Sequence, residues 1–161
     1  MASARFFYRD PNAPAPNRPD RVVIVAFVER DDLVLMERRA DCGQWCLLGG
    51  RVEPDQSIEA ALRQEVHEEA GLTVARFSLF AVFSDPSIIA QYELPSERVV
   101  ARVISLAFRV QADDVSPLQV SAESTELRFF THDELRTLDI ISTVRHIVDR
   151  YLEDRTALVV E

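Results

Sequence analysis

The alternation of apolar and polar positions along the chain predicts a series of strands interrupted by one strongly patterned helix. Runs of β-branched and aromatic residues, which suit the half-buried surface of a sheet, recur through the sequence. A short acidic turn at Asp31 and Asp32 separates the first two runs, which therefore predict a hairpin. The predicted strands cover residues 22–29, 33–38, 45–48, 74–83, 98–110 and 127–130.

Three segments follow the helical period instead. Residues 58–70 predict a helix with Ser57 as its N-cap and Gly71 just beyond its end. Residues 133–138 predict a short helical turn, and residues 141–152 predict a terminal amphipathic helix. Strands outnumber helices but the helices are substantial, so the pattern predicts an α/β fold in which helices cover a mixed sheet.

Two segments lack a clear period. Residues 1–20 hold four of the eight prolines and predict an extended arm without regular structure, whose aromatic run at residues 6–8 is available to dock on the domain. Residues 84–97 predict a polar loop, of a length that is usually functional or mobile. The remainder, residues 21–161, is expected to form a single domain, because 161 residues suffice for one core but hardly for two.

Charge narrows the possible functions. The net charge is −9, which argues against a protein that neutralises a nucleic-acid polymer. All 18 basic residues are arginines, and the absence of lysine excludes Schiff-base and P-loop chemistry. An anionic substrate would therefore need a metal bridge or a local group of arginines.

Three further features of the sequence argue against a zinc site, a membrane span and a secreted protein. Cys42 and Cys46 have no second pair of metal-ligating cysteines, so they predict free thiols rather than a zinc site. The longest apolar run, residues 22–28, is far shorter than the roughly 18 residues that a membrane span needs. No secretory signal is evident near Met1. We therefore expect a cytoplasmic protein that does not enter a membrane.

The predicted helix at residues 58–70 carries an unusual acidic pair. At about 100° per residue, Glu65 and Glu69 fall within the apolar stripe that includes Ile58 and Leu62. Such like charges repel, and turning them toward a core adds a desolvation cost that only an opposite charge can offset. Arg63 points away from the pair on the same helical wheel. Carboxylates suit hard cations, so the pattern favours a site for Mg²⁺ or Mn²⁺.

The residues around this helix, from Gly50 through Glu65, Glu68 and Glu69 to Gly71 and Leu72, resemble the Nudix box, whose pattern is G-x5-E-x7-R-E-U-x-E-E-x-G-U with U a bulky aliphatic residue. A second glycine at Gly49 and the approach Gly43-Gln44-Trp45 strengthen the resemblance. The four glycines of the chain all lie between residues 43 and 71, within this region. Seven of the nine specified positions match, namely Gly50, Glu65, Val66, Glu68, Glu69, Gly71 and Leu72.

The resemblance to the Nudix hydrolases, including MutT-like and ADP-ribose pyrophosphatase-like members, implies an α/β/α sandwich over roughly residues 21–152. It also implies metal-dependent hydrolysis of a pyrophosphate bond in a nucleoside diphosphate derivative, either a nucleotide or a nucleotide sugar such as ADP-ribose. Glu65 and Glu69 would then be the main ligands of Mg²⁺ or Mn²⁺. Glu68 would be a further ligand or would orient the attacking water, and the carbonyl of Gly49 would be a backbone ligand.

Further residues are candidates for substrate binding. Arg39 and Arg51, with Arg38, flank the box and are suited to phosphate oxygens, and Trp45 stands before the paired glycines. Glu123 and Glu126 are candidates for another ligand or a base, although a solvated loop is the favoured interpretation of both. Two more candidates, for contact with a base or ribose, are Tyr92 and Glu97, for which an ordinary surface loop is at least as good an interpretation.

Two positions depart from the family pattern. Gln56 replaces its first glutamate and Gln64 replaces its arginine. Our hypothesis is that the ionic contact between loop and helix is replaced by a neutral Gln56–Gln64 amide contact. Losing the arginine should raise the pKa values of the neighbouring carboxyl groups.

These two glutamines leave an alternative open, in which the chain is a non-catalytic nucleotide-sensing module. A third interpretation, an interaction domain without a ligand, leaves the inward glutamates unexplained. The partner expected is a small nucleotide, and a homodimer through the proline-rich arm or residues 157–160 is a further candidate.

Overall fold

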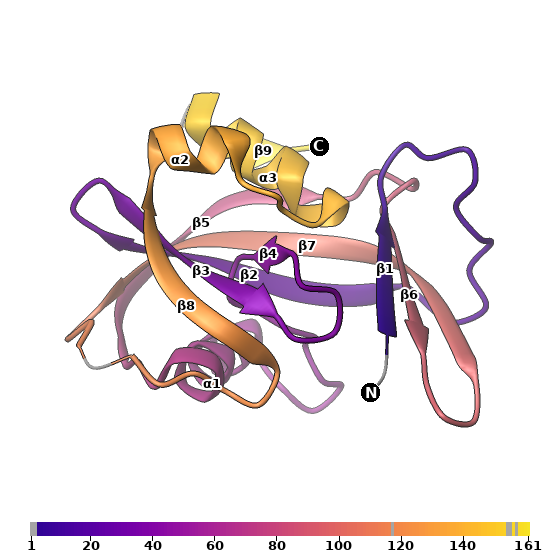
Figure 1. Cartoon of the computed structure of the whole chain (residues 1–161), viewed down its shortest axis with the longest axis horizontal. Helices are drawn as coiled ribbons and strands as arrows, with labels where there is room; N and C mark the ends of the chain where they lie inside the picture. The colour runs from indigo at the N-terminus through magenta and orange to yellow at the C-terminus, as the bar shows by residue number, and fades with distance from the viewer. Residues whose placement is uncertain (1–2, 117, 154–155, 157) are drawn as a thin grey trace.

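The computed structural model describes residues 3–116, 118–153, 156 and 158–161. Within them the strands join into one curled mixed sheet with helices on both faces (Figure 1). The strands are β1 (Ser3–Phe7), β2 (Arg21–Arg30), β3 (Leu33–Arg39), β4 (Trp45–Cys46), β5 (Val74–Phe83), β6 (Ile89–Glu93), β7 (Arg98–Ala112), β8 (Ser124–Thr131) and β9 (Val159–Val160). The helices are α1 (Ile58–Ala70), α2 (His132–Thr137) and α3 (Ser142–Glu153).

The long strand β7 organises the sheet. It runs parallel to β2, with residues 21–28 opposite residues 103–110. Along its other edge it pairs antiparallel first with β6 and then with β5. Beyond β2, the strand β3 pairs antiparallel with both β4 and β8. The predicted mixed sheet is thus confirmed, and the predicted hairpin at residues 22–38 forms with β2 and β3 paired at their turn end.

Two apolar cores lie on opposite faces of the sheet. One packs the sheet against α2 and α3, where the rings of Phe27 and Tyr151 stack with centroids 4.1 Å apart. The other packs it against α1 through Leu62 and Val66. Figure 1 shows α1 below the sheet and the other two helices above it, which confirms the α/β/α layering.

The bounds of α1 follow from its caps, as predicted. The hydroxyl oxygen of Ser57 accepts a hydrogen bond from the backbone N–H of Ala60 at 3.1 Å. At the other end Gly71 adopts a φ of 71° and donates its N–H to the carbonyl of His67. The two caps thus fix where the helix that carries Glu65 and Glu69 begins and ends.

Two expectations about irregular segments are wrong. The arm at residues 1–20 contains β1, and the loop at residues 84–97 contains β6, and the two strands pair antiparallel. The prolines did not prevent this pairing because Pro86 and Pro95 lie just outside β6 and the prolines of the arm begin only at Pro11. The outer edge of β6 therefore offers unpaired backbone groups that β1 satisfies.

The C-terminal residues also join the sheet. Strand β9 pairs parallel with β5, with Val159 opposite Ala81 and Val160 opposite Val82. Val159 and Val160 of the segment suggested for a dimer contact thus extend an edge of their own sheet, and Ala157 of that segment falls outside the described residues. None of the described helices is long and apolar enough to cross a membrane.

Candidate active site

A cavity of about 520 Å³ opens beside α1, between the sheet, the glycine loop and the loop before β8. Its size is within the range of small-molecule sites. It combines three kinds of side chain that point to a phosphorylated, partly aromatic ligand. These are the carboxylates of Glu65, Glu68, Glu69 and Glu123, the guanidinium groups of Arg21, Arg39 and Arg51, and the rings of Phe6 and Tyr92.

The paired glycines bring the backbone close to the carboxylates of α1. Gly49 has a φ of 149°, and a Cβ at this position would collide with the carbonyl oxygen of Ile24. Its N–H donates a hydrogen bond of 2.7 Å to Oε2 of Glu69. A Cβ on Gly50 would lie 2.5 Å from the carboxylate of Glu65. Glycine is therefore required at position 49, and at position 50 it leaves room for the Glu65 carboxylate to lie against the loop.

Glu69 is held in an environment that disfavours its charge. Only 6% of the residue is exposed. Burial, followed by the charge of Glu37, raises the pKa of Glu69 to about 9, against the lowering effect of the Gly49 N–H. Burial and then the charge of Glu68 raise the pKa of the half-buried Glu65 to about 7. Within the described residues neither carboxylate forms an ion pair, so the inward acidic pair predicted from the helical wheel lacks a cation of its own.

Glu37 is a member of this acidic group that the sequence did not single out. It lies on β3 and is 2% exposed, and its carboxylate accepts a hydrogen bond from the hydroxyl of Ser124. Burial raises its pKa as well. The available signal was the period of the strand, which places Glu37 on the same face as Leu35, a position where an apolar residue is usual.

The amide contact between the two unusual glutamines is confirmed. The side-chain amide of Gln56 donates to Oε1 of Gln64 at 2.6 Å, and the amide of Gln64 donates to Oε1 of Glu68 at 2.8 Å. At the loop end, the backbone N–H of Glu53 donates to Oε1 of Gln56. A chain of neutral hydrogen bonds therefore fixes the loop to the helix and holds the Glu68 carboxylate without adding positive charge.

Restoring the family's Glu–Arg ion pair at positions 56 and 64 tests whether the missing arginine raises the pKa values of the glutamates. In the double variant Gln56→Glu/Gln64→Arg we expect the acidic limb of the pH profile of hydrolysis to move about one pH unit lower, because a guanidinium near the glutamates favours their charged forms. The measurement is kcat/KM between pH 5 and 9. His67→Arg, which places a guanidinium like that of Gln64→Arg at an exposed position of α1 that does not line the cavity, is the control for the arginine. An equal shift in both variants would contradict a local effect.

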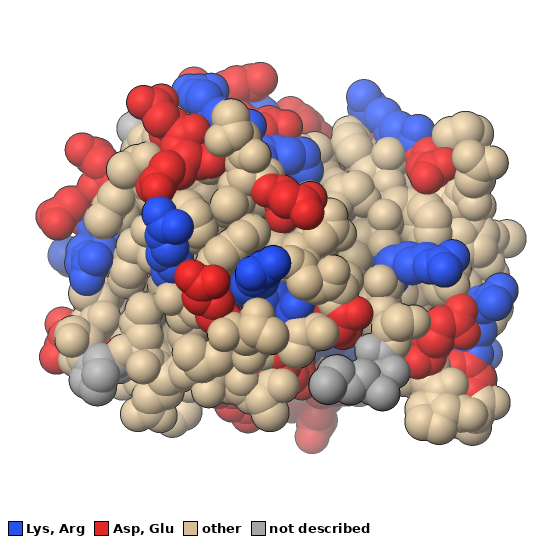
Figure 2. Space-filling view, in the orientation of Figure 1, with Lys and Arg blue, Asp and Glu red and all other residues tan. Residues whose placement is uncertain are grey.

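The predicted arginines differ in their surroundings. Arg39 lines the cavity and pairs with Asp41 at 2.5 Å, and Arg51 lines it as an exposed side chain. Arg38 does not line it and instead donates to the carbonyl of Gly43. The structure adds Arg21, whose guanidinium lies 5.1 Å from the centroid of the Tyr92 ring. Figure 2 shows that on the face of Figure 1 the arginines are scattered among acidic side chains rather than gathered into a basic stripe.

The remaining predicted positions separate into two groups. Glu123 and Tyr92 line the cavity, although a surface loop was the equal or favoured interpretation of each. Glu126 and Glu97 are exposed and do not line it. Trp45 packs edge-on against Phe130, with ring centroids 4.7 Å apart, and is not part of the cavity wall. This geometry gives no support to a contact between Trp45 and substrate.

Comparison with known proteins agrees with the fold and shows the family. A family model described as NUDIX domain matches residues 17–151, so the chain belongs to the NUDIX family. A solved structure of a NUDIX hydrolase from Nitrosomonas europaea covers 89% of this chain and 80% of its own, at 25% identity and a TM-score of 0.66.

Two curated relatives match over shorter segments. The 8-oxo-dGDP phosphatase NUDT18 of Mus musculus is 42% identical over 64 residues, which cover 38% of this chain and 20% of that protein. The nucleoside triphosphatase NudI of Salmonella schwarzengrund is 43% identical over 56 residues, which cover 32% of this chain and 40% of that protein. The chain thus aligns with less than half the length of either relative.

Proposed function

We propose that this protein hydrolyses a pyrophosphate bond in a nucleoside di- or triphosphate with the help of Mg²⁺ or Mn²⁺. The observation that carries the proposal is the pair Glu65 and Glu69, which is turned into a cavity without a cationic partner among the described residues. A buried pair of like charges is costly unless a ligand supplies the opposite charge.

The donor set fits a metal ion that substrate helps to hold. In the described part of the chain, no group of three or more His, Cys, Asp or Glu side chains is arranged to hold a metal ion by itself. Mg²⁺ commonly binds through only one or two carboxylates together with water and substrate phosphates. Glu65 and Glu69 would be those carboxylates, with Glu68 and the Gly49 carbonyl as further candidates. A bound divalent ion neutralises phosphate oxygens and lowers the pKa of a coordinated water.

The other side chains of the cavity have separate tasks in this proposal. Arg51 and Arg39 supply guanidinium groups suited to the phosphate oxygens. The Gly49 N–H orients the carboxylate of Glu69, and the Gln64 amide orients that of Glu68. Glu123 is exposed at the cavity and is the candidate to accept the proton of the attacking water.

The names of the matched relatives favour a nucleotide over a nucleotide sugar. The matched relatives are described as phosphatases of a nucleoside diphosphate and of nucleoside triphosphates. ADP-ribose stays a candidate, because the box alone does not select the leaving group. We expect a small-molecule nucleotide rather than a nucleic-acid polymer as the partner and the cytoplasm as the location, and a homodimer remains a prediction.

A substrate panel tests the proposal. Release of phosphate, pyrophosphate and nucleoside monophosphate would be measured with Mg²⁺ or Mn²⁺ on nucleoside di- and triphosphates, dinucleotides and ADP-ribose. We expect turnover that is highest for a nucleoside di- or triphosphate and is abolished by EDTA. Turnover highest for ADP-ribose would correct the substrate class. If none of them is turned over but calorimetry shows that one binds, the protein is instead the non-catalytic nucleotide-sensing module, the alternative suggested by Gln56 and Gln64.

A further inference from the structure

The cavity has an aromatic wall to which a residue outside the family match contributes. Phe6 of β1 lines the cavity, yet the NUDIX domain match begins only at residue 17. The carboxylates of α1 line the same cavity. A ligand whose phosphates reach Glu65 and Glu69 therefore has an apolar, aromatic surface within the same 520 Å³ space.

The pairing of β1 with β6 determines which side chains form this wall. Ala4 stands opposite Tyr92 and Phe6 opposite Ala90, so these four side chains share one face of the ribbon. The rings of Phe6 and Tyr92 meet edge to face, with centroids 6.1 Å apart and an interplanar angle of 89°. Phe7 is on the other face by the same alternation and does not line the cavity. The period of the strand thus selects Phe6 and not its neighbour.

Guanidinium groups accompany both rings. That of Arg39 lies 5.2 Å from the centroid of Phe6, and that of Arg21 lies 5.1 Å from the centroid of Tyr92. Arg39 is itself held by Asp41 through hydrogen bonds of 2.9 and 2.5 Å. The wall therefore combines aromatic rings with guanidinium groups. A heteroaromatic base can stack on the rings and accept hydrogen bonds from the guanidinium groups.

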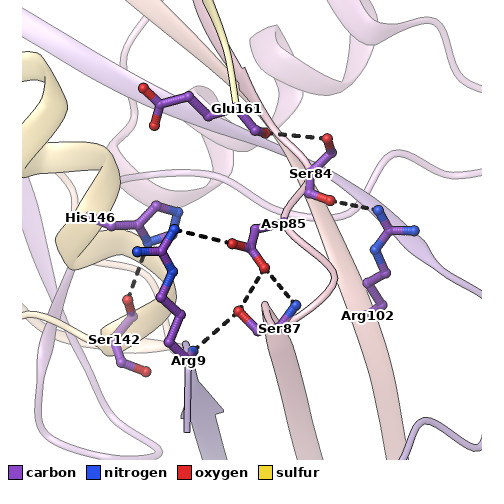
Figure 3. A network of polar contacts seen from close by, with 8 residues as sticks. All are labelled: Arg9, Ser84, Asp85, Ser87, Arg102, Ser142, His146 and Glu161. Atoms are coloured by element: carbon purple, nitrogen blue, oxygen red, sulfur yellow. Dashed lines mark hydrogen bonds and ion pairs between the residues drawn. The ribbon is translucent and has the colours of Figure 1, made fainter.

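Contacts from distant segments fix the strand that carries Phe6. The hydroxyl of Ser142 on α3 donates to the carbonyl of Phe6 at 2.7 Å, and the ring of Tyr8 stacks on His146 with centroids 4.1 Å apart. Figure 3 shows the adjoining network, in which Arg9 donates its backbone N–H to the Ser87 hydroxyl and approaches Asp85 with its side chain. Phe6 is therefore ordered before any ligand arrives, which reduces the entropy lost on binding.

We propose that Phe6 is a specificity-determining residue whose ring, together with Tyr92, contacts the base of the nucleotide. The inference rests on the proposed function, which places the phosphates at the glutamates, and it adds the recognition of the base. Stacking grows with the area of the ring system, so the substrate class is a purine nucleoside di- or triphosphate in preference to a pyrimidine one.

The test compares Phe6→Leu, which keeps apolar volume but removes the aromatic face, with Phe7→Leu as the matched control on the same strand. Binding of GMP and of CMP without metal would be measured by calorimetry, with GMP expected to bind the wild type more tightly. KM and kcat would be measured for GDP and for inorganic pyrophosphate, which has no base. For Phe6→Leu we expect about tenfold weaker GMP binding and about tenfold higher KM for GDP, as loss of one base stack implies, with kcat and the pyrophosphate constants within about twofold. Phe7→Leu should match the wild type.

Three results would overturn the inference: GMP failing to bind the wild type, Phe6→Leu binding GMP as well as the wild type does, or both leucine variants weakening GMP binding equally. A melting temperature for each variant separates a lost contact from a damaged fold. The proposed function fails differently, through absence of hydrolysis by the wild type on every substrate, and GMP binding still reports on Phe6 in that case.

Discussion

Glu69→Gln should lower metal-dependent hydrolysis by more than about a hundredfold, the upper end of what loss of a residue that only supports a metal site costs. The glutamine keeps the size of the side chain, and its carbonyl oxygen can still accept the Gly49 N–H. It removes the charge that would bind the cation. The measurement is kcat/KM for the best substrate of the panel with saturating Mg²⁺, together with calorimetric titration of Mg²⁺.

Stability should change in the opposite direction. With a pKa of about 9 in the folded protein against the ordinary 4.5, Glu69 of the metal-free protein must take up a proton to fold near pH 8, a cost that a neutral glutamine does not carry. We expect the melting temperature of Glu69→Gln in EDTA to equal or exceed that of the wild type near pH 8. Glu59→Gln makes the same change on the exposed side of α1, where Glu59 pairs with Arg63, and should leave hydrolysis unchanged. Full activity in Glu69→Gln would exclude Glu69 as a ligand.

The affinity for Mg²⁺ should increase about tenfold between pH 7 and pH 8, because binding requires the charged form of Glu69, whose pKa is raised to about 9. Below pH 7 the increase should be steeper, since Glu65, with a pKa of about 7, must also lose its proton. Calorimetric titration of Mg²⁺ from pH 6 to 9 measures this dependence. An affinity that does not change with pH over this range would contradict the assignment of these two carboxylates.

The same pKa values determine how the stability of the metal-free protein depends on pH. Both folded-state values lie above the ordinary value of 4.5, so the protonated forms stabilise the fold. Their contribution is complete below about pH 4.5 and is lost as the pH rises through about 7 and about 9. The melting temperature in EDTA should therefore fall across this window, and Mg²⁺ should raise it more at pH 8.5 than at pH 6.

Local signals in the sequence were sufficient for the helix at the centre of the site. Ser57 and Gly71 defined α1 because caps act through hydrogen bonds within a single turn. The Gln56–Gln64 contact was likewise predictable, since both residues belong to one short loop and the helix that follows it. The wheel placed Glu65 and Glu69 together for the same reason, as a spacing of four residues is slightly more than one helical turn.

The residues that lie near α1 at the cavity come from distant parts of the chain, so local sequence signals could not predict them. Glu123 lines the cavity because the loop before β8 is brought beside β3 in the folded sheet, and the charge of Glu37 on β3 acts on Glu69 although Glu37 does not line the cavity. Trp45, which the sequence placed near substrate, packs on Phe130 of β8 instead. Neither outcome is encoded in the spacing of residues near the box.

The order and pattern of the residues were enough to predict the layers of the fold, the bounds of α1 and the acidic pair on that helix. The residues near that pair became evident only in the folded chain: the arginines, Glu37 and the aromatic wall to which Phe6 contributes. The physical reason is that helix caps and periods are satisfied by neighbouring residues, whereas the pairing of β1 with β6 depends on which edge the completed sheet leaves open.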